Sequence, residues 1–286
     1  EMRRLPIAIL LAVASTACAA QEPPATSAAT PIVIGESRVL DSAVMGTKRI
    51  INVSLPPDYA EEGKTYPVLY LLDGGVDQDF LTVTGAMRLD AMWGRSRDAI
   101  VVGIQSVDRR AELTGPTSDP DLLATYPTAG QSEQFRRFLG DEVVPFVESH
   151  YRTNGESGVI GESLAGLFVL ETWLRQPRLF TRYVAISPSL WWDHEKLTRL
   201  APQLLRGGDI RPPLALVTEN EGEEMAAVAD RFAALLPGSA CHAPQTAYGH
   251  ATIYHAMTPA ALQFLFPPEQ APPPEYGFEV PCSPRS

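Results

Sequence analysis

The chain has 286 residues, of which 45% are hydrophobic, and this length and composition suit one large α/β domain. Its formal net charge at pH 7 is -11. A nucleic-acid partner requires a basic surface that neutralises phosphates, so the charge argues against nucleic-acid binding.

The first twenty residues have the order of a secretory signal peptide. Met2 and two arginines precede an apolar run from Leu5 to Val13, and small residues follow it. The run is shorter than the roughly 20 residues that a membrane-spanning helix needs. We therefore expect residues 1–20 to direct export, to the periplasm or the medium, without a stable membrane span. A lipid anchor on Cys18 is the alternative, although Ser15 stands where such signals usually carry Leu or Val.

Composition divides the rest of the chain into three parts. Residues 21–31 are rich in Pro, Ala, Ser and Thr without an apolar period, which predicts a flexible leader. Residues 32–266 carry the strand and helix patterns of a folded domain. Residues 267–286 contain too many prolines for regular structure and form a predicted tail.

The patterns within the folded domain predict strands that alternate with helices. Residues 49–55 alternate as a half-buried strand does. Continuous apolar runs, typical of strands covered on both faces, lie at 68–72, 100–104, 159–160, 183–186 and 214–217. Apolar residues at helical spacing lie within 135–146, 164–174 and 225–236, and Pro145 is expected to kink the first of these helices. The alternation predicts a mostly parallel central sheet with helices on both faces.

Ser163 lies between an apolar strand pattern and an amphipathic helix pattern. A nucleophilic serine on a sharp strand-to-helix turn needs small residues two positions before and after it, and Gly161 and Ala165 meet that need. The start of the helix would offer its positive dipole end and the N–H of Leu164 to an oxyanion. The pattern predicts that Ser163 is the nucleophile of a serine hydrolase. An ordinary turn before a helix is the alternative.

A second oxyanion donor is expected in the loop after an earlier strand. Gly74 and Gly75 directly follow the run 68–72 and would let the backbone approach a substrate carbonyl. We favour the N–H of Gly75 and leave Gly74 and Val76 open, with a simple turn as the alternative.

The base of the predicted triad is expected well after Ser163, because α/β-hydrolases order the triad as Ser, acid, His. His250 lies in a glycine-bearing loop after a further predicted strand at 241–246, where an imidazole can reach the nucleophile. His255 lies on the helix side of the same loop, and we expect it to be structural.

The acid should follow the strand at 214–217, where four glutamates are crowded. We favour Glu221, because the neighbouring Gly222 leaves it room to turn inward, and Glu219 is the alternative. A solvated acidic loop with no catalytic acid remains open.

Export would leave two cysteines in the mature chain, Cys241 and Cys282. An oxidising compartment makes such a pair a candidate disulfide, which would tie the tail to the strand before the His250 loop. Two independent thiols are the alternative.

Several motifs together resemble the esterase D superfamily, in particular the branch of trilactone siderophore esterases that includes the ferric enterobactin esterases. These motifs are Gly161–Phe168, Ser187–Trp192, Leu71–Gly74 and Tyr248–His250. The resemblance extends over residues 32–266 and implies an α/β-hydrolase fold and ester hydrolysis without a cofactor. Members of the family usually have His in place of Glu162 and Gly in place of Ala165.

The same resemblance suggests three substrate-binding candidates. Arg109 matches a family loop that carries an arginine, although an ion pair with Glu112 or Asp108 is the alternative. Trp191 and Trp192 either form the wall of an aromatic-binding pocket or fill the core.

The sequence therefore predicts an exported carboxylic-ester hydrolase that acts on a small-molecule ester without a metal or other cofactor. His250 would deprotonate Ser163, the N–H groups of Leu164 and Gly75 would hold the oxyanion, and water would release the acyl-enzyme. Two other functions remain open. One is an acyltransferase with the same Ser-His machinery, and the other is a non-catalytic binding protein on a hydrolase scaffold.

Overall fold

The structure is a computed structural model that describes residues 28–206, 211–278 and 282. The signal peptide expected at residues 1–20, with Cys18, lies outside the described residues. Among those that are described, no helix combines the length and the apolar character needed to cross a membrane.

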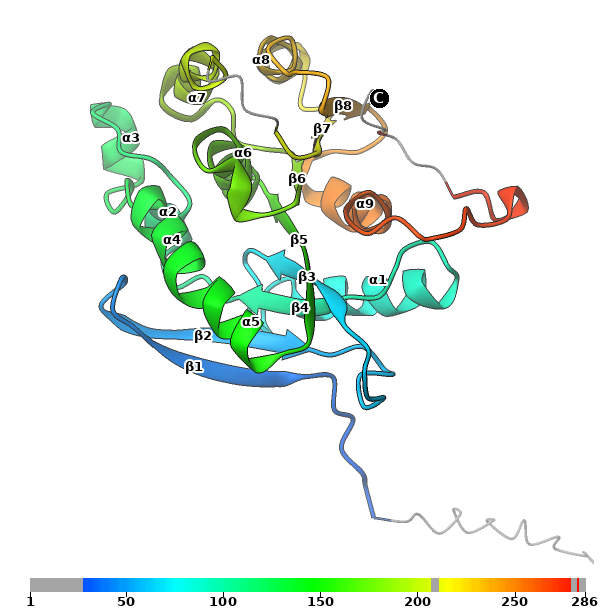
Figure 1. Cartoon of the computed structure of the whole chain (residues 1–286). Helices are drawn as coiled ribbons and strands as arrows, with labels where there is room; N and C mark the ends of the chain where they lie inside the picture. The colour runs from blue at the N-terminus through cyan, green and yellow to red at the C-terminus, as the bar shows by residue number, and fades with distance from the viewer. Residues whose placement is uncertain (1–27, 207–210, 279–281, 283–286) are drawn as a thin grey trace, which may run out of the picture. The chain divides into compact units, whose positions relative to one another are not determined.

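A single eight-stranded sheet lies at the centre of the fold, in the order β1-β2-β4-β3-β5-β6-β7-β8 (Figure 1). The strands are β1 (Glu36–Ser42), β2 (Thr47–Ser54), β3 (Tyr66–Leu71), β4 (Ile100–Ile104), β5 (Thr153–Glu162), β6 (Arg182–Ile186), β7 (Leu214–Glu219) and β8 (Ala240–Gln245). The β1–β2 and β2–β4 pairs are antiparallel, and every other neighbouring pair is parallel. The mostly parallel sheet predicted from the sequence is confirmed.

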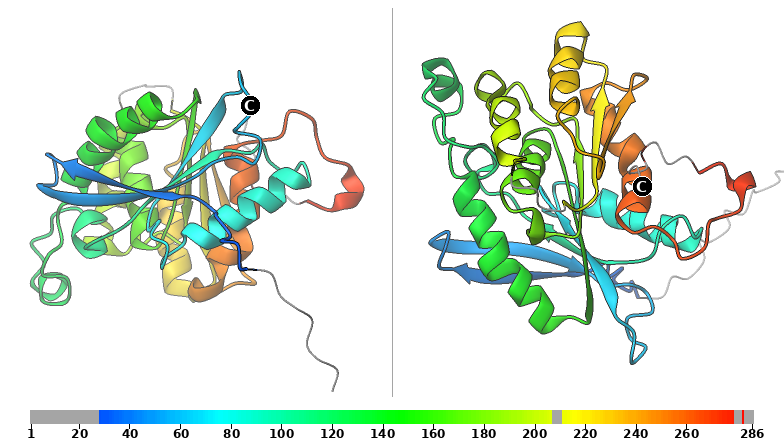
Figure 2. Two further views of the ribbon diagram at one scale, coloured as in Figure 1. Left: turned by 90° about the horizontal axis from the view of Figure 1, so that it is seen from below. Right: turned by 45° about the horizontal axis from the view of Figure 1, so that its top comes forward.

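Helices cover both faces of this sheet (Figure 2). They are α1 (Phe80–Met92), α2 (Arg109–Glu112), α3 (Pro120–Thr125), α4 (Ser132–Phe138), α5 (Val144–His150), α6 (Leu164–Arg175), α7 (Trp192–Leu204), α8 (Glu223–Ala233) and α9 (His250–Leu265). Buried side chains of α1 and α9 pack on one face, and those of α4 to α8 pack on the other. This arrangement is that of an α/β-hydrolase, as the sequence predicts.

Strand β3 shows why the central strands read as continuous apolar runs. Val68 and Tyr70 pack on the face covered by α4 to α8, whereas Leu69 and Leu71 pack on the face covered by α1 and α9. Successive residues of a strand point to opposite faces, so a strand covered on both faces has no polar position.

The helix predicted at 135–146 is interrupted. α4 continues into a π-helical segment (Leu139–Val143), and α5 follows with Pro145 in its first turn. Because proline has no N–H, it fits the first turn of a helix, and the π-helical segment absorbs the change of hydrogen-bond pattern just before it. The change in helix type thus falls just before Pro145, where the sequence predicts a kink.

Cys241 on β8 and Cys282 form a disulfide, with their Cα atoms 5.8 Å apart. Cys282 is buried and packs against the core formed by α9 and the sheet. The predicted pairing is confirmed, and the bond fixes this tail residue to the strand that precedes His250.

We expect reduction of this disulfide to lower the melting temperature by about 5–15 °C. The bond closes a loop with a sequence separation of 41 residues. Such a loop stabilises the folded state by about 2–4 kcal/mol in the chain-entropy model, and a melting temperature of a domain this size shifts by about 2–4 °C per kcal/mol. Differential scanning calorimetry with and without reductant, with the Cys241→Ser/Cys282→Ser variant as the control that reductant should not affect, measures this shift. An unchanged melting temperature would contradict the stabilising role.

Candidate active site

Ser163 occupies the junction between β5 and α6. Its backbone has φ 60° and ψ -120°, a conformation that L-residues rarely adopt. Its N–H donates to the carbonyl oxygen of Ile186 at 3.1 Å, which fixes the turn to β6. A Cβ at Gly161 would lie 2.7 Å from the Cβ of Ala165, so strand and helix approach too closely for a larger residue. The local geometry is that of a nucleophile elbow.

The loop after β6 contacts this serine directly. The Oγ of Ser189 lies 3.3 Å from the Oγ of Ser163, and its N–H donates to the Ser163 carbonyl at 3.0 Å. The loop also reaches the opposite side of the site, because the Ser187 hydroxyl donates to Glu219 and lies 2.5 Å from Nδ1 of His250. No role is predicted for Ser187 or Ser189 from the sequence, although both belong to the Ser187–Trp192 motif that contributes to the family resemblance.

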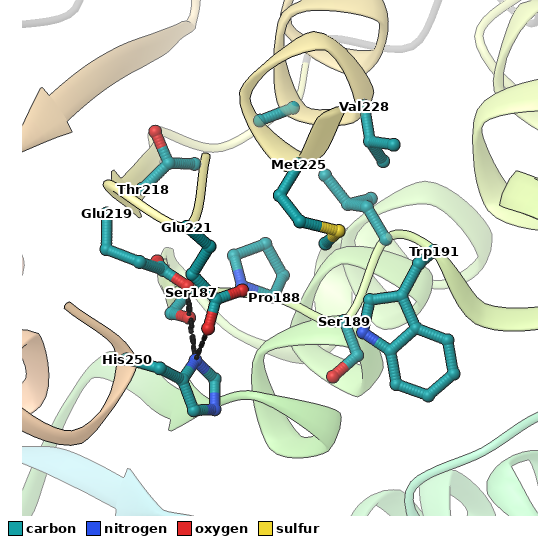
Figure 3. Close-up of a pocket in the computed structure, with 12 residues that line it drawn as sticks. Ser187, Pro188, Ser189, Trp191, Thr218, Glu219, Glu221, Met225, Val228 and His250 are labelled. Carbon is teal, nitrogen blue, oxygen red and sulfur yellow. Dashed lines mark hydrogen bonds and ion pairs between the residues drawn. The ribbon is translucent and has the colours of Figure 1, made fainter. Parts of the chain in front are cut away.

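His250 is the first residue of α9, and its imidazole meets both predicted carboxylates (Figure 3). Nδ1 lies 3.1 Å from Oε1 of Glu219 and 3.4 Å from Oε1 of Glu221. The Glu219 side chain is 7% exposed, whereas that of Glu221 is 33% exposed. Because Nδ1 faces the carboxylates, Nε2 is the nitrogen left to act as a base.

The charges at this cluster shift the pKa values of its members in different directions. The hydrogen bond with Glu219 raises the pKa of His250, and the charges of Glu221, Glu219 and Glu162 act in the same direction against the effect of burial. Burial acts to raise the pKa of Glu219, but hydrogen bonds with His250 and Ser187 outweigh it and hold that pKa below its ordinary value. Burial and the charge of Glu219 raise the pKa of Glu221. Glu219 is therefore the carboxylate that stays ionised more readily.

The N–H groups of Leu164 and Gly75, the two predicted oxyanion donors, differ in whether they are free to bind an oxyanion. Leu164 is the first residue of α6, and N–H groups in the first turn of a helix have no acceptor within the helix. The N–H of Gly75 donates to Oε1 of Gln78 at 2.9 Å, so it can bind an oxyanion only after this hydrogen bond breaks. The N–H of Gly74 donates to the carbonyl of Ile104 at 2.8 Å and belongs to the fold.

Arg109 pairs with a carboxylate that the sequence analysis did not consider. Its Nη2 lies 3.0 Å from Oδ2 of Asp73, and its side chain remains 41% exposed. The expected pairing with Glu112 or Asp108 is wrong. Glu112 forms a buried ion pair with Arg49 at 2.7 Å, and Asp108 caps α2. Glu112 pairs with Arg49 because an unpaired guanidinium charge at this buried position would be energetically costly.

The two adjacent tryptophans lie in different environments. Trp192 is 3% exposed and packs edge-on against Tyr126, with ring centroids 5.3 Å apart. Trp191 is half-buried and lies at the edge of a pocket next to His250 (Figure 3). Other residues that line this pocket include Ser189, Glu219, Glu221, Met225 and Val228. Each of the two interpretations therefore fits one tryptophan: core packing for Trp192 and a pocket wall for Trp191.

Among the described residues, the group whose ligand atoms could converge on a metal ion is Glu219, Glu221 and His250. Its three side chains are those of the base and acid cluster. Their proximity is what the predicted triad expects of its base and its two candidate acids, and we propose no metal ion for them.

The fold and the serine turn define a protein of the α/β-hydrolase class. The chain belongs to the esterase family described as "Putative esterase", whose model matches residues 42–223. The family-level resemblance seen in the sequence is thereby confirmed.

Known relatives of this chain include siderophore esterases. Ferri-bacillibactin esterase BesA of Bacillus subtilis is 35% identical over 147 residues, which are 45% of this chain and 49% of the relative. Siderophore enterobactin esterase of Emericella nidulans is 29% identical over 55% of this chain and 58% of the relative. The chain thus matches about half the length of these curated relatives.

A solved structure agrees over a longer span. An IroE-like serine hydrolase from Shewanella oneidensis is 26% identical, with a TM-score of 0.71, and the match covers 81% of this chain and 80% of that chain. The shared fold therefore extends over most of both chains.

Proposed function

We propose that this chain is a serine esterase that hydrolyses a carboxylic ester through an acyl-enzyme on Ser163. One observation carries the proposal. The strained turn at Ser163 is held by a loop whose Ser189 contacts the nucleophile and whose Ser187 contacts His250. A strained serine and a base that carboxylates orient, both in contact with the same loop, support an acyl-transfer function.

In the proposed mechanism, Nε2 of His250 takes the proton of Ser163 while Oγ attacks the ester carbonyl. The N–H of Leu164 and, once Gln78 releases it, the N–H of Gly75 stabilise the oxyanion. The proton then passes from His250 to the departing alcohol. Water, deprotonated by the same imidazole, hydrolyses the acyl-enzyme and restores the serine.

We propose Glu219 as the principal acid of the triad. The sequence favours Glu221, and in the structure both carboxylates reach Nδ1 of His250. The shorter distance, the deeper burial and the hydrogen bond from Ser187 favour Glu219. Glu221 then acts as a second, more exposed carboxylate that adds to the field at the imidazole.

The pH dependence of kcat/KM tests this assignment. Because the base must be neutral and Glu219 raises the pKa of His250, we expect activity to fall as the pH drops through a value above 6.5. Glu219→Gln should move this acidic limb to lower pH and lower kcat by at least about tenfold, since the imidazolium loses its main partner. Glu221→Gln should shift the acidic limb and lower kcat to a smaller extent. A larger shift with Glu221→Gln would assign the acid to Glu221 instead.

We propose siderophore lactone esters as the substrate class, because curated relatives are named as esterases of bacillibactin and enterobactin. Trp191 at the pocket edge offers a surface for an aromatic acyl group, and exposed Arg109 offers a polar contact. Turnover of a panel of trilactone siderophores, feruloyl esters and short p-nitrophenyl esters tests this proposal. Hydrolysis of p-nitrophenyl esters alone would contradict the siderophore assignment but not the esterase.

We also propose that the chain is exported. Residues 1–20 would be the signal peptide, 21–31 the leader, 32–266 the catalytic domain and 267–286 the tail. The Cys241–Cys282 disulfide supports this proposal, because such bonds persist in oxidising compartments. Cell fractionation tests it: esterase activity confined to the cytoplasm would contradict export, and activity in the membrane fraction would indicate a lipid anchor on Cys18.

A further inference from the structure

Several carboxyl groups interact with Glu162, the residue directly before the proposed nucleophile. Glu162 ends β5, and Asp79 immediately precedes α1, where its side chain makes no capping hydrogen bond. Glu162 is electrostatically coupled to Asp79 and to Glu219, both of which act to keep its proton bound. The end of β5, the start of α1 and the end of β7 thus contribute carboxyl groups that interact with one another at the residue before Ser163.

The positive charge near the site does not balance these carboxyl groups. Arg109 is the guanidinium that acts on both Glu162 and Asp79 among the described residues, but it forms its ion pair with Asp73. The other basic group that acts on Glu162 is His250, and the proposed mechanism requires it to be neutral at the start of the reaction. His255 acts on Asp79 but is not among the groups that act on Glu162. A substrate therefore meets a site with an excess of negative charge.

Glu162 carries an unsatisfied carboxylate oxygen directly before the proposed nucleophile. Its Oε1 is buried and has no hydrogen-bond partner in the described part of the chain. The hydroxyl of Tyr254, a fully enclosed side chain on α9 that is electrostatically coupled to Glu162, is likewise buried without a partner. Buried polar groups are normally hydrogen-bonded, so Glu162 and Tyr254 each have unused hydrogen-bonding capacity.

We infer that Glu162 is a specificity-determining residue, and that with its acidic neighbours it makes the site select esters that are neutral or positively charged near the scissile carbonyl and reject anionic ones. This inference rests on the proposed esterase function and narrows its substrate class. A negatively charged group brought beside Glu162 would have to be desolvated next to a like charge, and like-charge contacts reduce affinity for the wrong partner.

If the site rejects anionic esters, siderophore esters of different charge should be hydrolysed at different rates. A ferric complex of three catecholates is a trianion, whereas the iron-free molecule has protonated catechols at neutral pH and the ferric complex of three hydroxamates is uncharged. The site should therefore hydrolyse iron-free catecholate lactones and neutral hydroxamate esters faster than ferric catecholate complexes.

The pH dependence of this selectivity follows from the groups around Glu162. They are Asp79 before α1, Arg109 on α2, Glu219 on β7, and His250 and Tyr254 on α9. Burial raises the pKa of Glu162 to about 7 and that of Asp79 to about 6. Rejection of anionic esters should therefore strengthen as the pH rises through 7, the pKa at which Glu162 becomes charged. Protonation of His250 lowers kcat/KM by the same factor for both substrates. The ratio of the two kcat/KM values therefore does not depend on the ionisation of His250.

The test uses the full chain and three p-nitrophenyl esters of equal acyl length that end in a methyl, a carboxylate or a trimethylammonium group. At about pH 8 the wild type should prefer the neutral ester to the anionic one by at least about tenfold in kcat/KM, and the cationic ester should be no worse than the neutral one. Glu162→Gln should reduce the neutral-to-anionic ratio at least about threefold and flatten its pH dependence. Glu148→Gln, which removes an exposed carboxylate on α5, should leave the ratio unchanged.

Two further measurements keep the test decisive. Glu162→Ala repeats the comparison if circular dichroism shows that the glutamine variant does not fold. In the wild type, added salt should reduce the neutral-to-anionic ratio of kcat/KM, because it screens the charge of solvent-exposed Glu221. Equal turnover of the three esters, or a ratio that Glu162 variants leave unchanged, would overturn the inference while leaving the esterase proposal standing. No turnover of any ester, siderophore lactones included, would instead overturn the esterase proposal and the inference with it.

Discussion

Replacement of Ser163 with alanine is expected to lower kcat/KM for ester hydrolysis by at least about a thousandfold while the protein stays folded. The change removes the oxygen that would form the acyl-enzyme. It also removes one contact, with Ser189 at 3.3 Å, but leaves the backbone hydrogen bonds of the turn in place. Turnover of a p-nitrophenyl ester and thermal unfolding of the same samples measure the two effects separately.

A second serine variant serves as the control for this experiment. Ser149 is exposed on α5 and hydrogen-bonds locally to Phe146, so Ser149→Ala should keep wild-type turnover. A folded Ser163→Ala protein that hydrolyses the ester as fast as this control would remove Ser163 from the mechanism.

Replacement of His250 with alanine is expected to be nearly as damaging, again by at least about a thousandfold, because nucleophile and base act as one unit. His255→Ala should change turnover less than about threefold, since a substitution away from the reacting groups has a small effect. His255 is exposed on α9, and its ring packs beside Tyr254 at a centroid distance of 6.4 Å.

The pair of histidine variants provides its own control, because both positions lie on the same helix. Steady-state kinetics at a pH above the acidic limb, with circular dichroism to verify folding, distinguishes them. Loss of activity in His255→Ala and retention in His250→Ala would assign the base to His255.

The central sheet could be predicted from the sequence because burial on both faces leaves a simple signature. Each of the runs at 68–72, 100–104, 183–186 and 214–217 overlaps a parallel strand. Strand β1 was missed because its side chains are mostly exposed and carry no apolar alternation. Helix α1 was missed because polar Thr84 and Asp90 belong to its buried face, which obscures the helical period.

The candidate site likewise has features that could be predicted from the sequence and features that could not. Ser163, His250 and the glutamate loop could be located because the order of the triad along the chain and the strand-to-helix context are local signals. The choice between Glu219 and Glu221 was not local, since it depends on how the end of β7 faces the first turn of α9.

Contacts across the sheet could not be derived from spacing. The Arg109–Asp73 pair joins residues 36 positions apart, and the Ser187 contacts with Glu219 and His250 depend on the register of β6 against β7. Such contacts follow from tertiary packing, for which sequence periodicity carries no signal.

Covalent labelling with a fluorophosphonate, read by intact-protein and peptide mass spectrometry, tests the central claim most directly. A serine activated by a base reacts with such a probe, whereas ordinary serines do not. We predict one adduct per chain, on the peptide that contains Ser163, and much slower labelling in His250→Ala. An unlabelled wild-type protein, or an adduct on a different residue, would contradict the claim that Ser163 is the nucleophile.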